Sequence, residues 1–100
     1  MKIYDWIADK LGGYCTPETV VLSIIYGYYE NGKDCFYSYK TLAETAGTSV
    51  ITMKRAVKKL REAGYIEVFK NNFTDTNLYT PDYRITEKWR EEWLLKNGTN

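Results

Sequence analysis

Residues 38–66, which read SYKTLAETAGTSVITMKRAVKKLREAGYI, decide the fold of this chain. Ser38 can cap a helix over residues 39–45, because its hydroxyl can accept a hydrogen bond from a free amide of the first turn. Residues 46–48 contain Gly47 and predict a tight turn. Ser49 can then cap a longer helix over residues 50–63, which ends at Gly64 in a left-handed position. The stretch therefore predicts two helices joined by a short turn.

The longer helix is expected to have an apolar side and a basic side. Met53, Val57 and Leu60 recur at spacings of four and three residues, with Ala56 beside them, so they form one apolar stripe. Five basic residues share the remaining surface, and no acid lies among them: Lys54, Arg55, Lys58, Lys59 and Arg61. We expect the stripe to be buried and the basic residues to face solvent.

The net charge is informative only when it is divided along the chain. The 14 basic and 13 acidic residues of the 100-residue chain give a formal charge of +1. Residues 1–38 carry 3 bases and 5 acids, residues 39–70 carry 7 and 3, and residues 71–100 carry 4 and 5. The net charges are thus −2, +4 and −1, and the basic segment contains the predicted longer helix. Such segregation favours a polyanionic partner for that helix.

The other expected elements surround this pair of helices. Thr16 and Pro17 begin a helix that runs to about Tyr29, and its apolar residues cover most of the circumference, so it should be central. Further elements are expected as an amphipathic helix over residues 3–11, a short strand over 33–37, a β-hairpin of residues 65–70 and 78–85 with a loose tip at 71–77, and a last helix over 87–96.

Missing residue types exclude several kinds of chemistry. Without histidine there is no imidazole base, no dyad that uses one, and no imidazole metal ligand. Cys15 and Cys35 do not form a C-x-x-C motif, and we expect reduced thiols, buried or half-buried, rather than a disulfide. We therefore predict a non-enzymatic protein with no catalytic residue, metal or cofactor. The charge-free apolar run over residues 19–29 has about half the length that a membrane-spanning helix needs, and no secretory signal is visible. The simplest interpretation is therefore a cytoplasmic protein with no membrane partner.

The order of the elements resembles that of a winged helix-turn-helix, a mostly helical α+β fold. Residues 38–49 resemble the first helix and turn of such domains, and residues 50–66 resemble the recognition helix, its glycine stop and the first wing strand. The resemblance is to DNA-binding domains of phage and plasmid replication-initiation proteins, and partition proteins share the architecture. It implies one winged-helix domain over residues 1–100, with an N-terminal arm or helix over 1–13, a core over 16–86 and a C-terminal helix over 87–97.

The resemblance implies that the helix over residues 50–63 enters the major groove of double-stranded DNA and reads its sequence. Arg55 can pair with a guanine, Lys54 and Lys58 are expected to contact phosphates, and Val50, Ile51 and Thr52 can meet thymine methyl groups. The full set of candidate DNA-binding residues is Ser49, Val50, Ile51, Thr52, Lys54, Arg55, Lys58, Lys40, Lys70, Asn71, Asn72 and Arg84.

Two features depart from the resemblance. Val50 and Ile51 occupy positions that often carry basic or amide residues, so this end of the helix either reads methyl-rich A·T sequence or packs against protein. The wing tip contains no lysine or arginine, and its Asn71 and Asn72 either bind in a minor groove or only form the turn. Phe73 at the tip suggests a protein contact or folding back onto the body. The alternative function is therefore a protein-interaction module without direct DNA binding.

Assembly of several copies is also expected. A single winged helix with roughly four to six phosphate contacts binds DNA modestly, so we predict a homodimer or cooperative assembly on repeated sites. Trp89 and Trp93 on the last helix, and Ile3 and Trp6 near the N-terminus, either pack within the chain or form that interface. The process served is predicted to be replication initiation, partition or transcriptional control in a phage or plasmid.

Overall fold

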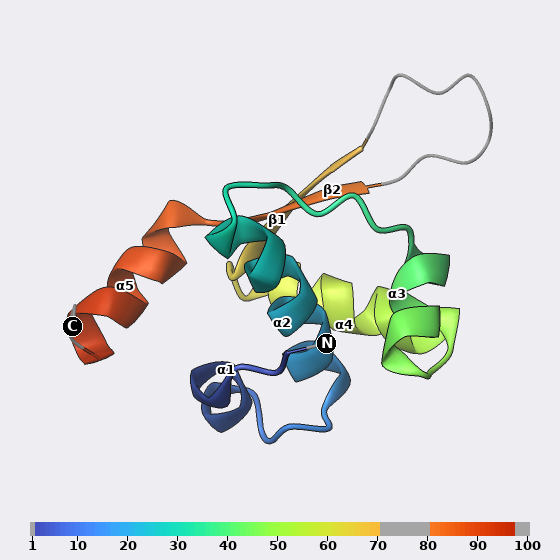
Figure 1. Cartoon of the computed structure of the whole chain (residues 1–100), viewed down its shortest axis with the longest axis horizontal. Coiled ribbons are helices and arrows are strands. Elements are labelled where there is room, and N and C mark those ends of the chain that lie inside the picture. Colours follow the sequence, from blue (N-terminus) through green and yellow to red (C-terminus); the bar gives the residue numbers. More distant parts are fainter. Residues whose placement is uncertain (1, 71–80, 98–100) are drawn as a thin grey trace.

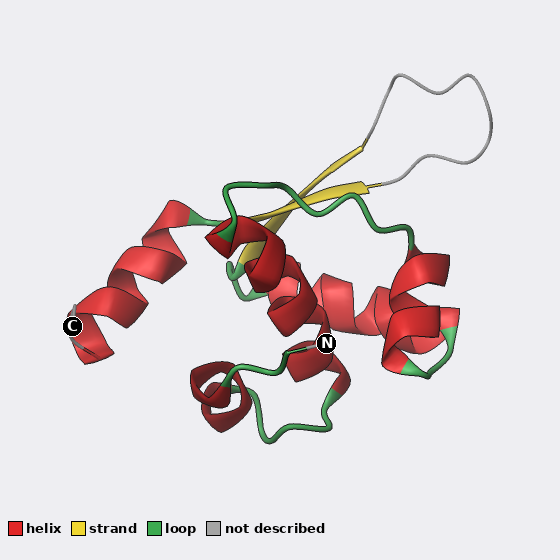
Figure 2. Cartoon of the chain, viewed as in Figure 1, coloured by secondary structure: helices red, strands yellow, loops and turns green. Residues whose placement is uncertain are grey.

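The computed structural model describes residues 2–70 and 81–97 of the chain. Within these residues, five helices and two strands follow one another in the predicted order (Figures 1 and 2). They are α1 (Asp5–Lys10), α2 (Pro17–Glu30), α3 (Tyr39–Ala46), α4 (Val50–Glu62), β1 (Ile66–Lys70), β2 (Pro81–Ile85) and α5 (Glu87–Asn97). The described part of the chain is thus mostly helical with a two-stranded sheet, as predicted, and α1 is shorter than expected at both ends.

Helix α2 is the central helix, as its apolar circumference predicted. It contacts α1, α3, α4 and β2, which lie around it in Figure 1. Its start is capped by Thr16, whose side-chain oxygen accepts a hydrogen bond from the amide of Thr19 at 3.3 Å, and Pro17 occupies the first helical position. Because elements cover it on several sides, Val21 and Leu22 are fully buried.

The connection from α3 to α4 is the tight turn that residues 46–48 predicted. Ser38 and Ser49 cap the two helices, accepting hydrogen bonds from the amides of Thr41 at 3.1 Å and Thr52 at 3.2 Å. Gly47 ends α3 in the left-handed region, with φ of +71° and ψ of 35°. A residue with a Cβ atom is strained in this conformation, so glycine here allows α4 to leave α3 sharply and to pack against it.

The strands β1 and β2 form an antiparallel pair in which Ile66 lies opposite Ile85 and Lys70 opposite Pro81. The predicted strand over residues 33–37 is wrong in its extent. Only Cys35 pairs, and its carbonyl accepts a hydrogen bond from the amide of Tyr83 at 2.9 Å. The reason is that the connection between α2 and α3 passes β2 and then turns at once into α3. The predicted hairpin tip at 71–77 lies outside the described residues.

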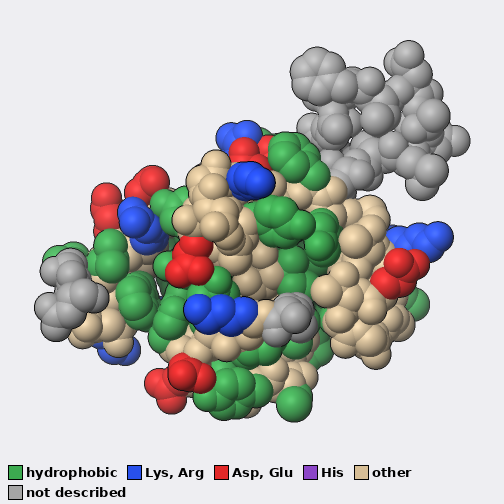
Figure 3. Space-filling view, in the orientation of Figure 1, with side chains coloured by type: hydrophobic (Ala, Val, Ile, Leu, Met, Phe, Trp, Pro, Cys, Tyr) green, Lys and Arg blue, Asp and Glu red, His purple; other side chains and the backbone are tan. Residues whose placement is uncertain are grey.

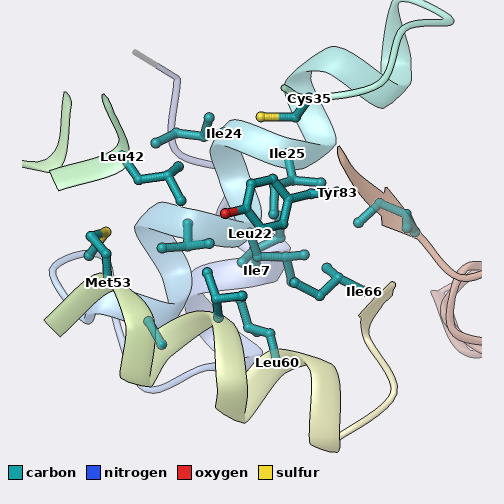
Figure 4. Close-up of a cluster of buried hydrophobic side chains, with 14 of the residues drawn as sticks. Ile7, Leu22, Ile24, Ile25, Cys35, Leu42, Met53, Leu60, Ile66 and Tyr83 are labelled. Atoms are coloured by element: carbon teal, nitrogen blue, oxygen red, sulfur yellow. The ribbon is translucent and has the colours of Figure 1, made fainter. Parts of the chain in front are cut away.

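The hydrophobic core lies between α2, α4 and the inner face of the sheet (Figure 4). Each of α1, α3 and the segment after α2 adds a side chain that is fully buried: Ile7, Leu42 and Cys35. Helix α4 adds Met53, Ala56, Val57 and Leu60, so the predicted apolar stripe is confirmed. The strands add Ile66, Tyr83 and Ile85. These contacts set the rotation of α4 about its axis, which decides what this helix presents to solvent.

A terminal aromatic cluster, made of Trp6, Tyr26, Trp89 and Trp93, joins α1, α2 and α5. The ring centroid of Trp6 lies 4.5 Å from that of Trp93, 4.8 Å from that of Tyr26 and 5.3 Å from that of Trp89. Trp89 is only 3% exposed. These tryptophans therefore pack within one chain, which was one of the two predicted alternatives. Their use as an interface between copies, with half-buried Ile3, stays a prediction.

Candidate nucleic-acid interface

The exposed side of α4 follows from the burial of its apolar stripe. Four residues at positions i, i+4, i+7 and i+11 lie opposite that stripe and are exposed. We call them the outer ridge: Ile51, Arg55, Lys58 and Glu62. Helix α4 carries five basic residues and one acid, whereas basic and acidic side chains are interspersed among hydrophobic ones on the face of the molecule shown in Figure 3. The basic residues of α4 therefore meet solvent both on the outer ridge, through Arg55 and Lys58, and on its flanks, through Lys54, Lys59 and Arg61.

The first turn of α4 carries no charge and uses its own hydroxyl groups. The Ser49 oxygen accepts from the amide of Thr52 at 3.2 Å, and the two side-chain oxygens lie 2.8 Å apart in a hydrogen bond. Val50 and Ile51 are 38% and 62% exposed. The leading end of the helix therefore presents mainly hydrocarbon, together with the positive end of the helix dipole.

Three of the five basic side chains of α4 have a partner inside the chain. The Lys58 ammonium lies 3.9 Å from Glu62, and both side chains are largely exposed. Lys59 lies 3.3 Å from Glu18 at the start of α2, and Lys54 lies 5.7 Å from the ring centroid of Tyr39. The Lys58–Glu62 pair is worth little because water screens it, so Lys58 can exchange its partner for a polyanion, whereas the Glu18 carboxylate that pairs with Lys59 is only 21% exposed.

Arg55 and Arg61 differ from these lysines in their partners. Among the described residues, neither guanidinium has a carboxylate within ion-pair distance. Arg55 lies in the middle of the outer ridge, one turn after Ile51. A planar guanidinium with five donors suits bidentate hydrogen bonding to a phosphate or to a guanine edge. The best-placed cation for sequence readout on α4 is therefore Arg55.

Several candidate residues lie outside α4. Lys40 is exposed at the start of α3. Lys70 ends β1. Asn71, Asn72 and Phe73 lie outside the described residues, so the predictions for them stay predictions.

Arg84 is held by acidic neighbours that the sequence analysis did not anticipate. Its Nε lies 3.3 Å from Asp34 and its Nη2 lies 2.8 Å from Asp82, while its Cζ lies 4.8 Å from the ring centroid of Phe69. The spacing of Asp82 and Arg84 was a usable signal, because residues two apart in a strand share a face. Asp34 had no such signal, since it comes from the segment after α2. Because these contacts occupy its guanidinium, Arg84 is not among the DNA contacts that we propose.

The two cysteines are free thiols in different surroundings. Cys15 is exposed, so the prediction that it is buried or half-buried is wrong. Cys35 is buried in the core, and burial raises the pKa of its thiol to about 11. Because only the thiolate is nucleophilic, Cys35 stays protonated and inert near neutral pH. Within the described residues, no three carboxylate or thiol side chains gather as metal ligands would, and no helix is long and apolar enough to cross a membrane.

The fold and the exposed surface of α4 together define a winged helix-turn-helix protein. A comparison with protein families agrees: residues 16–66, about half of the chain, match the family described as Helix-turn-helix domain. The chain belongs to this family. The matched segment runs from the capping residue of α2 to the first residue of β1. No curated protein and no solved structure matches the chain. Membership of the family indicates DNA as the partner.

Proposed function

We propose that the protein binds double-stranded DNA in a sequence-specific manner, with α4 in the major groove. The observation that carries this proposal is the composition of the outer ridge. Short uncharged side chains stand at the leading end of α4, and long basic side chains follow one turn later on the same exposed face. A helix that enters the groove by its N-terminus brings its leading residues against the base edges, and the long basic side chains behind them can reach either a base edge or the phosphate backbone.

Each basic residue of this surface has a separate role in the proposal. Arg55 donates two hydrogen bonds to a guanine, and Lys54 and Lys58, which are four residues apart and share one side of α4, contact phosphates. Lys40 at the start of α3 contacts the backbone, because the first helix of such a pair crosses the phosphates. Lys70 lies at the base of the wing and contacts a phosphate there. These contacts are consistent with the exposure of Lys40, Lys54, Arg55 and Lys58 in the free protein.

Two or more copies act together in this proposal. A few phosphate contacts give a single winged helix only modest affinity, and the acidic segments on either side of residues 39–70 weaken attraction to DNA in general. Half-sites about one helical turn apart, or tandem sites, supply the missing affinity. Analytical ultracentrifugation with and without a selected site tests this, and a single short site saturated by one copy would overturn it.

The process that we propose is replication initiation, partition or transcriptional control in a phage or plasmid. What supports it is the resemblance of residues 38–66 to the domains of such proteins. Selecting bound fragments from a library of genomic DNA distinguishes the three processes, because the fragments originate from a replication origin, a partition site or a promoter. Fragments from none of these places would refute this part of the proposal.

The experiment that tests DNA binding itself is a salt titration. A fluorescent duplex of mixed sequence is titrated with the protein at low ionic strength, and the affinity is measured again as the salt concentration rises. We expect the logarithm of the binding constant to fall linearly with the logarithm of salt, with a slope of about −4 to −5 for four to six phosphate contacts. Absence of any salt-dependent binding would overturn the proposal.

A second candidate function is a protein-interaction module that does not contact DNA. The observation that favours it is the exposure of Val50 and Ile51, at 38% and 62%, at the leading end of α4. An exposed apolar pair of this kind also suits a protein groove. The same titration decides between the two, because a protein-interaction module shows no salt-dependent affinity for duplex DNA.

A further inference from the structure

We infer that Ile51 reads the C5-methyl group of a pyrimidine, so that the protein distinguishes thymine and 5-methylcytosine from uracil and cytosine at one position of its site. This inference rests on the proposed DNA binding and deepens it. The sequence alone offered Val50, Ile51 and Thr52 as equivalent candidates for methyl contacts. The structure separates them and adds a relation to Arg55.

Ile51 is the apolar residue that leads the outer ridge. It is 62% exposed and lies on the same face as Arg55 and Lys58. Val50 is 38% exposed and lies about 100° around the helix from Ile51, on the flank of the ridge. Thr52 is half-buried and lies on the opposite flank. When the outer ridge faces the floor of the major groove, Ile51 meets the base edges first.

The chemistry of the first turn determines what Ile51 can read. The hydroxyls of Ser49 and Thr52 are hydrogen-bonded to each other, and Ser49 also accepts from the amide of Thr52. The group presented to the bases is therefore the hydrocarbon of Ile51. In the major groove the C5-methyl group of thymine is the one apolar group that projects from a base edge beside the donors and acceptors, and cytosine carries only a hydrogen at C5. An isoleucine set against a polar edge would strip water from hydrogen-bonding groups without replacing it, which is unfavourable.

The spacing on the helix links this contact to that of Arg55. Residues four apart in an α-helix are separated by about 6 Å along the axis. Successive base pairs are separated by about 3.4 Å. A methyl group under Ile51 and a guanine under Arg55 therefore lie one or two base pairs apart. We expect a half-site in which a methylated pyrimidine precedes or follows a guanine at that distance.

The size of the effect follows from the area of one methyl group. Burying one such group contributes a factor of about four to the binding constant, from the usual transfer free energy of a methylene group. Removing the methyl from the DNA, or the side chain from Ile51, should each lose this factor. Removing both should lose little more than either, because the two groups act as a pair.

The experiment uses the full chain and a duplex selected from a random library. Each thymine of the selected site is replaced, one at a time, by deoxyuridine, which keeps the base pair and removes only the methyl group. We expect one such position in each half-site to weaken binding about fourfold. We expect Ile51→Ala to bind the unmodified site about fourfold more weakly and to be insensitive to deoxyuridine at that position. Leu95→Ala, which truncates a leucine that is 85% exposed on α5, is the matched control and should keep the sensitivity.

A second arm tests the methyl group on another base. At the sensitive position, cytosine is compared with 5-methylcytosine in otherwise identical duplexes, and the methylated form should bind about fourfold more tightly. If no duplex is bound at low salt, the proposed function fails and this inference fails with it. If a site is bound but no single deoxyuridine weakens binding, or if Ile51→Ala keeps the sensitivity, the inference is overturned while DNA binding stands. The thermal midpoint of each variant confirms that the fold is intact.

Discussion

Changing Arg55 and Lys58 to alanine tests most directly which side chains bind DNA. Both side chains are exposed on the outer ridge and neither lies in the core, so the fold should be unaffected. Arg55 has no carboxylate partner among the described residues. The ion pair of Lys58 with Glu62 spans 3.9 Å between side chains that are 67% and 62% exposed. Such a pair contributes at most about 0.5 kcal/mol to stability.

The expected loss of affinity can be worked out from the two roles. Removing one phosphate contact with Lys58→Ala lowers the magnitude of the salt slope by about 0.9, which is about eightfold in affinity at 0.1 M salt. Removing a bidentate contact to guanine with Arg55→Ala costs about 1–3 kcal/mol at the selected site, which is about 5- to 150-fold. The double variant should therefore bind about 40- to 1,000-fold more weakly, with a salt slope reduced by only about 1.

The assay is fluorescence anisotropy with a labelled duplex of the selected site, over a range of salt concentrations. Lys88→Ala, which removes an exposed lysine from α5, is the matched control and should leave both affinity and slope close to those of the unchanged chain. Circular dichroism and urea unfolding verify that each variant folds. Unchanged affinity of the double variant, or an equal loss in the control, would refute the assignment of these contacts to the outer ridge.

Three further predictions concern charge, backbone and pH. Glu62→Gln breaks the ion pair with Lys58 and removes the acid of the outer ridge, so DNA binding at 0.1 M salt should tighten about twofold in the anisotropy assay. At high salt the variant should bind no more tightly than the unchanged chain, because salt screens the charge of Glu62. Gly47→Ala puts a side chain at φ of +71° in open space, so urea unfolding should show a loss of about 1 kcal/mol from backbone strain alone. The pKa of Cys35 is raised from 9.0 to about 11, so the unfolded chain loses this proton first, and the free energy of unfolding should fall as pH rises above about 9. That fall should be smaller in Cys35→Ala, and equal falls would show that the buried thiol is not responsible.

The parts of the fold that were predictable from the sequence are those set by neighbours along the chain. Thr16, Ser38 and Ser49 cap their helices as predicted, because a cap bonds to an amide three residues away. Gly47 and Gly64 adopt positive φ at the ends of α3 and α4 for the same local reason. The apolar stripe of α4 was also predictable, since helical periodicity alone selects its members.

What could not be predicted depends on partners far away in the sequence. Arg84 pairs with Asp82 of its own strand and with Asp34 of the segment after α2. Only folding brings Asp34 next to Arg84, because the two residues are far apart in the sequence. The strand over 33–37 was overpredicted because the single pair of Cys35 with Tyr83 depends on the path of that segment past β2. For the site, periodicity placed Arg55 on an exposed face correctly, whereas the exposed fractions of Ile51 and Val50, 62% and 38%, depend on the packing around α4 and came only from the structure.

The terminal aromatic cluster gives the protein an intrinsic spectroscopic signal. All three tryptophans of the chain, Trp6, Trp89 and Trp93, lie in this cluster, and none belongs to α4. Their emission and near-ultraviolet dichroism therefore measure whether α1 and α5 are closed on each other, without any label. Binding of DNA at α4 should leave this signal unchanged. A shift on adding DNA or a second copy would show that the surroundings of these tryptophans have changed.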